Sequence, residues 1–286
     1  MVRQWAPALL ILALCVAAAA GCRSRGWVQV SAASSHTCAL RKDGTVKCWG
    51  GEEEFGYSRA PADKFVKIAT GNTHSSALDK RGAITCWGWR VHGQCKPPSG
   101  AFSEVGGGYL HACGRLRTDG TLACWGLDVF GRSTPPDGTF TRLAVGYDHT
   151  CALREDGTAA CWGRHHEGQT RPPAGPFTRL AAGGSHSCGL RRGGAVTCWG
   201  TNHRGQSKPP AGSFIMIDAG AEHTCGVRTD GSVACWGRNF EGQRDAPSGA
   251  FAHVSAGDTH TCGLRTDGSI SCWGCGKWDS GQCEEP

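Results

Sequence analysis

The strongest constraint on the fold of this chain is a unit that runs from His36 to Gly50, because the chain repeats it. Each copy has a start like His-Thr-Cys, an Asp-Gly pair or a close variant, and an end like Cys-Trp-Gly. The copies begin at His36, His74, His111, His149, His186, His223 and His260. Successive histidines are 37 or 38 residues apart, and so constant a period predicts a repeat architecture in which neighbouring units share one core.

The centre of the unit predicts a β-hairpin. The runs before and after Asp43-Gly44 alternate in polarity, and an Asp-Gly pair supplies the turn that joins two such strands. Counting outward from the turn, Cys38 faces Cys48. Directly opposed residues have Cα atoms about 4.5–5.5 Å apart, a separation that a disulfide can span.

The same count predicts a ladder of cross-strand disulfides in six of the seven repeats. The third copy has one extra residue. Its two cysteines can therefore face each other only if the first strand bulges near Gly114 or Arg115. The second copy has Ser76 in place of its first cysteine. The predicted pairs are Cys38–Cys48, Cys113–Cys124, Cys151–Cys161, Cys188–Cys198, Cys225–Cys235 and Cys262–Cys272.

The other cysteines of the repeats favour the pairs Cys86–Cys95 and Cys275–Cys283, because Cys95 and Cys283 each follow a Gly-Gln pair. Zinc is the alternative in a chain rich in His and Cys, but zinc sites use Cys-x-x-Cys or similarly close spacings. The one such spacing joins Cys275 to a cysteine that already has a hairpin partner. We therefore expect no metal and no cofactor.

A third short strand precedes each histidine. An aromatic and a branched residue three apart, followed by Ala and Gly, are typical of a short buried strand with a tight exit. These runs begin at Trp27, Phe65, Phe102, Phe140, Phe177, Phe214 and Phe251. Small sheets of this kind protect their edges by closing into a ring, so we expect an all-β, seven-bladed β-propeller over residues 27–286. One way to close the ring places the strand Trp27–Val30 in the last blade.

Residues 1–21 have the features of a secretory signal peptide. Arg3 gives a positive start, Ala8 to Ala20 form an apolar core, and Ala19-Ala20-Gly21 offer small residues for cleavage. The apolar run is too short to span a membrane as a helix.

Cys22 directly follows this segment, an arrangement that resembles a bacterial lipoprotein signal, in which that cysteine becomes lipidated. Residues 22–26 then form a short tether, and Arg23 fits sorting to the outer membrane. We therefore expect an extracytoplasmic protein, lipid-anchored and otherwise free of the membrane. Ordinary cleavage and secretion in soluble form is the alternative.

The repeated motif resembles the regulator of chromosome condensation repeat family, over essentially all of residues 27–283. The short period is similar to that of the compact bacterial branch, which includes a secreted type-II β-lactamase inhibitor protein. The paired cysteines are similar to those of the ectodomains of plant Crinkly-type receptor kinases. Members act as exchange factors for a small GTPase, chromatin binders or protein-binding platforms, so the resemblance implies the fold and no single function. A signal peptide and many disulfides argue against the nuclear roles.

Charge and motifs exclude several function classes. The formal charge of +6 falls by one when Arg3 is removed, and no basic run stands out, so we expect no nucleic-acid binding. The chain has no Gly-x-Ser-x-Gly elbow, phosphate loop or His-Glu-x-x-His motif. One histidine in every unit indicates a structural hydrogen bond in each blade, because a functional site usually breaks the symmetry.

The loops after the Trp-Gly pairs do break the symmetry and form the candidate binding site. Their aromatic side chains are typical of recognition when a rigid scaffold carries them; the alternative is that they fold back as wedges between blades. The candidate residues are Phe55, Tyr57, Trp89, Phe130, His165, His203, Phe240 and Trp278.

These observations predict a monomeric, non-enzymatic, protein-binding propeller, with a secreted or envelope enzyme as one candidate partner. A surface lectin that stacks the same aromatic rings on polysaccharide is the first alternative. An extracellular hydrolase or lyase is the second, and it requires a pair of pocket carboxylates with raised pKa.

Overall fold

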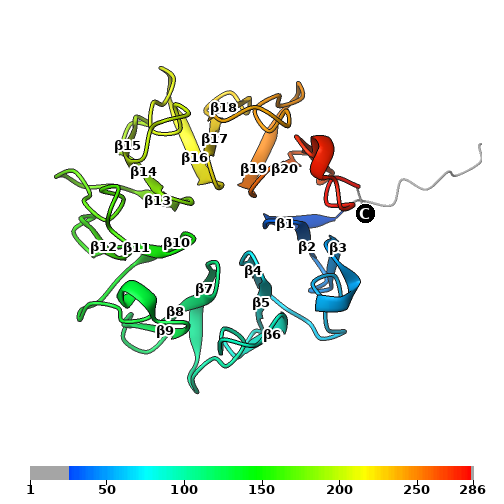
Figure 1. The fold of residues 1–286 in the computed structure, drawn as a ribbon, viewed down its shortest axis with the longest axis vertical. Coiled ribbons are helices and arrows are strands. Elements are labelled where there is room, and N and C mark those ends of the chain that lie inside the picture. The colour runs from blue at the N-terminus through cyan, green and yellow to red at the C-terminus, as the bar shows by residue number, and fades with distance from the viewer. Residues whose placement is uncertain (1–25, 285–286) are drawn as a thin grey trace, which may run out of the picture.

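The computed structural model describes residues 26–284, which form a ring of seven three-stranded antiparallel sheets (Figure 1). Each repeat gives one blade, with its strands paired in chain order. The all-β, seven-bladed propeller that the repeat period predicts is therefore confirmed. The signal peptide and Cys22 lie outside the described residues, and so do residues 285–286.

The first strands of the blades lie nearest the axis of the ring. They are β1 (Trp27–Ala32), β4 (Lys67–Thr70), β7 (Phe102–Gly107), β10 (Arg142–Val145), β13 (Arg179–Ala182), β16 (Phe214–Ala219) and β19 (Phe251–Ala256). The middle strands are β2 (His36–Arg41), β5 (His74–Leu78), β8 (His111–Leu116), β11 (His149–Leu153), β14 (His186–Leu190), β17 (His223–Arg228) and β20 (Thr261–Arg265). The outer strands are β3 (Val46–Gly50), β6 (Ile84–Gly88), β9 (Leu122–Gly126), β12 (Ala159–Gly163), β15 (Val196–Gly200), β18 (Val233–Gly237) and β21 (Ile270–Trp273). Three short 3₁₀ turns of the described chain interrupt the loops: η1 (Glu53–Phe55), η2 (Val129–Gly131) and η3 (Gly276–Trp278).

The hairpins have the predicted register. Cys38 pairs with Cys48 across β2 and β3, and their Cα atoms are 4.0 Å apart. Gly44 closes the turn with a φ of +89°, a conformation that glycine adopts without steric cost. All six predicted cross-strand disulfides are present. Bridges also join Cys86 to Cys95 and Cys275 to Cys283.

The bulge expected in the third hairpin is wrong. Residues of β8 and β9 pair without a register shift from His111 to Arg115. The turn takes up the extra residue: Leu116 N donates to Thr121 O, so the turn spans 117–120, whereas that of the first hairpin spans 42–44. A longer turn keeps every strand hydrogen bond, which a bulge would interrupt.

The prediction that the strand Trp27–Val30 closes the ring as part of the last blade is also wrong, because β1 pairs with β2 in the first blade. The ring closes instead through the loop after β21. Its Gln282 carbonyl accepts hydrogen bonds from Trp49 Nε1 (2.9 Å) and Thr37 Oγ1 (3.2 Å) in the first blade. The same tryptophan bond joins other neighbouring blades, as from Trp199 to the Gln169 carbonyl (2.7 Å).

The core lies between neighbouring blades. Leu40 and the Cys38–Cys48 disulfide of the first blade pack against Phe65 and Trp87 of the second. Burying one such apolar side chain stabilises the fold by about 1.5–3 kcal/mol. Since each blade buries its apolar residues only against its neighbours, the closed ring is the unit of stability.

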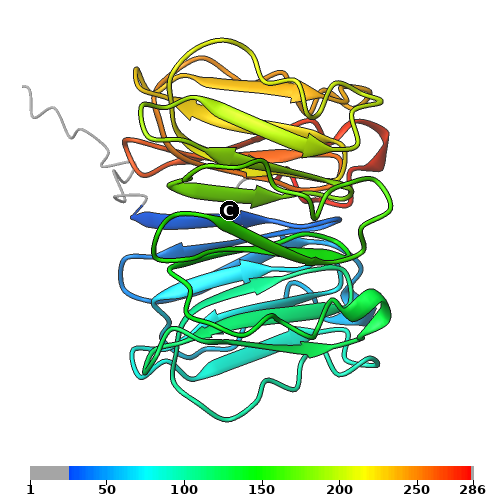
Figure 2. The same cartoon turned by 90° about the vertical axis from the view of Figure 1, so that its left-hand side faces the viewer.

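The two faces of the ring carry different segments (Figure 2). The turns between middle and outer strands, such as 42–44, lie with the starts of the first strands on the hairpin face. The segments after each Trp-Gly pair begin on the opposite loop face, together with the connections from first to middle strands, and return to the hairpin face before the next first strand. Among the described residues no helix is long and apolar enough to cross a membrane.

Candidate functional site

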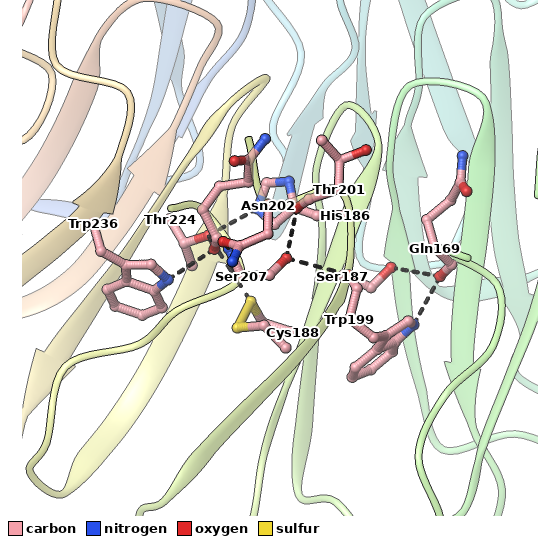
Figure 3. The surroundings of a disulfide bond; sticks show 12 residues. Gln169, His186, Ser187, Cys188, Trp199, Thr201, Asn202, Ser207, Thr224 and Trp236 are labelled. Carbon is pink, nitrogen blue, oxygen red and sulfur yellow. Dashed lines mark hydrogen bonds between the residues drawn. A yellow bond between two sulfur atoms is a disulfide. The ribbon is translucent and has the colours of Figure 1, made fainter. Parts of the chain in front are cut away.

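The recurring histidines are buried at the junctions between blades (Figure 3). His186 Nε2 lies 2.8 Å from Thr224 Oγ1 in the next blade, and that hydroxyl donates to the Gln206 carbonyl (3.1 Å). Because the hydroxyl gives its proton to the carbonyl, His186 must donate through Nε2. Burial, with His149 nearby, lowers the pKa of His186 to about 3.

The same side-chain bond recurs around the ring, at His36–Ser75, His111–Thr150, His149–Ser187, His223–Thr261 and His260–Thr37. Within residues 26–284, no three His, Cys, Asp or Glu side chains are arranged to hold a metal ion. The histidines are thus links between blades.

One link is missing, which gives a stability prediction. His74 Nε2 has no hydrogen-bond partner among the described residues, because Ala112 occupies the position of the hydroxyl. Replacing Ala112→Ser should supply an acceptor for His74 and a donor to the Gln94 carbonyl, and so raise the free energy of unfolding by about 1–2 kcal/mol. Urea denaturation measures the change. Ala152→Ser, at an equally buried alanine, is the control and should destabilise the protein; equal effects would contradict the assignment.

A cavity of about 270 Å³ lies on the axis, inside the first strands. Burial raises the pKa of two of its lining carboxylates, Asp218 and Asp258, to about 6. Asp218 Oδ2 accepts from Ala256 N (2.9 Å), and Asp258 accepts from Asn72 Nδ2 (3.1 Å). The hydrolase alternative requires such a pair. However, the cavity is below the usual size of ligand pockets, about 300–1,000 Å³, and both carboxylates bind neighbouring segments together.

The most exposed aromatic side chains of the described chain lie on the loop face of blades three to six. Phe130, in η2, is 49% exposed and packs edge-on against His166, with ring centroids 5.6 Å apart. Phe240 is 66% exposed, and the guanidinium groups of Arg204 and Arg238 lie 5.0 and 5.1 Å from its ring centroid.

A pocket of about 340 Å³ is lined by residues of blades four to six, and its lining includes residues next to the contacts of these two aromatic side chains. On one side its lining residue Glu167 follows His166 in the chain. On the other side its lining residue Glu222 pairs with Arg238 at 3.2 Å. The ionisable and aromatic residues of the lining are Tyr147, Asp148, Arg164, Glu167, His203 and Glu222. We call Phe130, His166, this pocket, Arg238 and Phe240 the loop-face surface.

The structure divides the predicted binding residues into two groups. Phe130, His165, His203 and Phe240 are exposed and belong to blades three to six. Phe55 and Trp89 are half-buried on blades one and two, with ring centroids 6.3 Å apart. The side chain of Trp278 lies outside what the structure describes.

Tyr57 is not a surface residue, which corrects its place among the candidates. It is 8% exposed, and its ring stacks on that of His36 at 5.2 Å. Its carbonyl accepts from Trp87 Nε1 (3.0 Å), the bond that a glutamine carbonyl makes at most other junctions. For Tyr57 the wedge interpretation is therefore the correct one.

Sequence reasoning missed the charged residues of the pocket, although one signal was present. Gly131 is followed by Arg132, where the equivalent loops of blade two and of blades four to seven have glutamine. Arg132 is buried and forms an ion pair with Asp148, which also lies 3.7 Å from Arg164. The position at which arginine replaces the repeated glutamine thus lies at the edge of the loop-face surface.

These features define a propeller built from equivalent blades with one asymmetric surface on its loop face. The family model for the regulator of chromosome condensation (RCC1) repeat matches residues 27–56, 140–169, 177–206, 216–243 and 251–282. The chain therefore belongs to the RCC1 repeat family.

Solved structures agree with this assignment. The CRINKLY WD40 ectodomain of the Arabidopsis thaliana receptor kinase ACR4 is 27% identical, over 87% of this chain and 96% of that one, with a TM-score of 0.77. The ectodomain of the Physcomitrella patens receptor kinase CR4 is 24% identical over 87% and 74%, with a TM-score of 0.75. Prp20p from Saccharomyces cerevisiae is 17% identical over 88% and 83%, with a TM-score of 0.66. Because the last two structures are less than 25% identical to this chain, their similarity shows the fold alone. No curated protein matches the chain.

Proposed function

We propose that this chain is an exported, non-enzymatic propeller that binds a protein through its loop-face surface and is anchored by a lipid on Cys22. The observation that carries the proposal is the group formed by Phe130, the pocket and Phe240. Large aromatic residues beside arginine and a lined pocket are the features of interface hot spots.

A propeller of the same fold serves protein binding. The yeast RCC1 protein Prp20p is described with binding properties to Gsp1p and histones, and it is seen bound to Kap60. We expect this chain to bind a different partner from these proteins. The eight disulfides of residues 26–284 favour an oxidising compartment. A protein of the cell envelope or the medium is therefore the partner we expect.

The binding site can be tested by substitution. Phe130→Ser with Phe240→Ser should weaken retention of the partner by about 30-fold or more, as expected when a hot spot is lost. Both side chains are exposed, so folding should be unchanged. Val91→Ser is the matched control, because Val91 is an exposed apolar residue of the blade-two loop. The measurement is affinity capture from envelope and medium fractions, followed by titration of the captured protein.

A partner that the double variant retains at full affinity would contradict the proposal. Binding of a defined glycan on an array, lost in the same double variant, would favour the lectin instead, because exposed aromatic rings stack on sugar faces as well.

Export and anchoring need a separate experiment, the intact mass of protein recovered from the native membrane fraction. An acylated Cys22, with a gain of two hydrogens per bridge on reduction, is the expected result. An unmodified mass and protein in the medium would replace the anchor with free secretion.

A further inference from the structure

The hairpin face carries a ring of side chains around the mouth of the axis. Each comes from the same register position of a first strand. Gln29 pairs with Leu40 in blade one, and Arg142 pairs with the equivalent Leu153 in blade four. Gln29, Met216 and His253 line the axial cavity, so the equivalent residues also face the axis. The ring consists of Gln29, Lys67, Glu104, Arg142, Arg179, Met216 and His253.

The three cations of this ring, Lys67, Arg142 and Arg179, come from blades two, four and five. Arg142 and Arg179 are exposed and form no ion pair among the described residues. They lie close enough that Arg142, together with burial, lowers the pKa of Arg179. Glu104 is the one acid of the ring. Burial raises its pKa although Lys67, Arg115 and Arg142 lie near enough to oppose the shift, and Arg115 is 3.8 Å away. Three cations outnumber this one acid, so the mouth has a net positive charge.

Exposed apolar side chains continue the same face on blades one, two, six and seven. Val28, Val66 and Ile215, each one residue before its ring position, are between 43% and 49% exposed. They belong to blades one, two and six, and exposed Ala252 fills the same position in blade seven. Blades three to five have Ser103, Thr141 and Thr178 there. One arc of the face is thus apolar and the other polar and cationic.

Apart from Glu104, a set of acids on this face lies in the turns, away from the ring. Asp43 accepts hydrogen bonds from Thr45 N (2.9 Å) and Thr45 Oγ1 (2.6 Å), and it pairs with Lys64 at 3.1 Å. Asp119, Asp156, Asp230 and Asp267 make the same contacts with the residue two positions on. These hydrogen bonds lower the pKa of Asp43, Asp119, Asp156 and Asp230, so the turn carboxylates stay charged, but they lie at the rim, away from the mouth.

The chain enters the ring on this face, because β1 begins at Trp27 beside the turn: Lys42 N donates to the Gly26 carbonyl (2.7 Å). Residues 22–26 can extend by at most about 17 Å. A lipid on Cys22 would therefore keep the hairpin face, and not the loop face, beside the membrane.

We propose that the hairpin face rests on an anionic phospholipid surface, with Val28, Val66 and Ile215 in the interface and Lys67, Arg142 and Arg179 against the phosphates. The loop-face surface then points away from the membrane, toward the partner. The orientation rests on the proposed anchor, but the contact itself does not. Basic residues attract anionic lipid over about a Debye length, and apolar side chains add affinity by insertion.

The experiment measures vesicle binding by the exported chain with Cys22→Ser, which removes the lipid. Vesicles of phosphatidylcholine with 30% phosphatidylglycerol should bind it at low salt, and vesicles of pure phosphatidylcholine should not. Arg142→Gln with Arg179→Gln should weaken binding about 30-fold, and Ile215→Ser should weaken it further. The matched control is Arg90→Gln with Arg204→Gln on the loop face, which should bind like the parent.

Equal binding to neutral vesicles, no binding to anionic ones, or an equal loss in the loop-face control would overturn the proposal. Failure of the anchor is distinguishable, since the intact mass reports it and the vesicle experiment uses a protein without lipid.

Discussion

Reduction of the disulfides is expected to unfold the ring under conditions in which the oxidised protein is stable. The eight bridges of the described chain close loops with sequence separations of 8 to 11 residues. In the chain-entropy model each contributes about 2–3 kcal/mol. Together they exceed the 5–15 kcal/mol by which domains are usually stable.

Urea denaturation followed by tryptophan fluorescence, with and without a reductant, measures this effect. Cys86→Ser with Cys95→Ser removes one bridge and should lower the free energy of unfolding by only about 2–3 kcal/mol. A reduced protein with an unchanged urea midpoint would show that packing between blades suffices.

Acidification from pH 7 to pH 5 is expected to destabilise the protein by on the order of 10 kcal/mol. Burial lowers the pKa of the junction histidines, to about 3 for His36, His186 and His223, to about 4 for His74, His149 and His260, and well below the usual value for His111. The unfolded chain takes up protons below about pH 6.5, and the folded chain does not. Stability is therefore complete above pH 6.5 and falls with pH, by about 2 kcal/mol per histidine at pH 5.

Three carboxylates, Glu104, Asp218 and Asp258, act in the opposite direction. Burial raises their pKa, so the folded state takes up these protons first, and for Asp218 and Asp258 the pKa is about 6. The contribution of these two aspartates grows as the pH falls through 6, but it reaches only about 3 kcal/mol together at pH 5. The net effect is a loss of stability. Urea midpoints at pH 7.5, 6 and 5 measure it, and a constant midpoint would contradict the burial of neutral histidines.

The blades could be predicted because they depend on residues within one repeat. The Asp-Gly turn fixes the pairing of Cys38 with Cys48, and the repeat of that pairing fixes the number of blades. The third hairpin could not be decided in this way, since a bulge or a longer turn places Cys113 opposite Cys124 equally well.

Contacts between repeats were harder to predict, and the site consists of such contacts. Tyr57 is buried because the loop of the first blade turns back onto His36. Asp148 meets Arg132 although they come from loops of different blades. The sequence indicated which loops are aromatic, but not which of them gather around one pocket.

The most direct test of the account places a photo-crosslinking residue, p-benzoylphenylalanine, at Phe240, at Phe130 or at Val91 in the exported protein, one position at a time. We expect one discrete protein adduct from Phe240 and from Phe130, and none from Val91. A partner bound on the loop-face surface must contact the first two positions. Adducts of equal yield from Val91, or no adduct from either phenylalanine position, would contradict the assignment of the binding site.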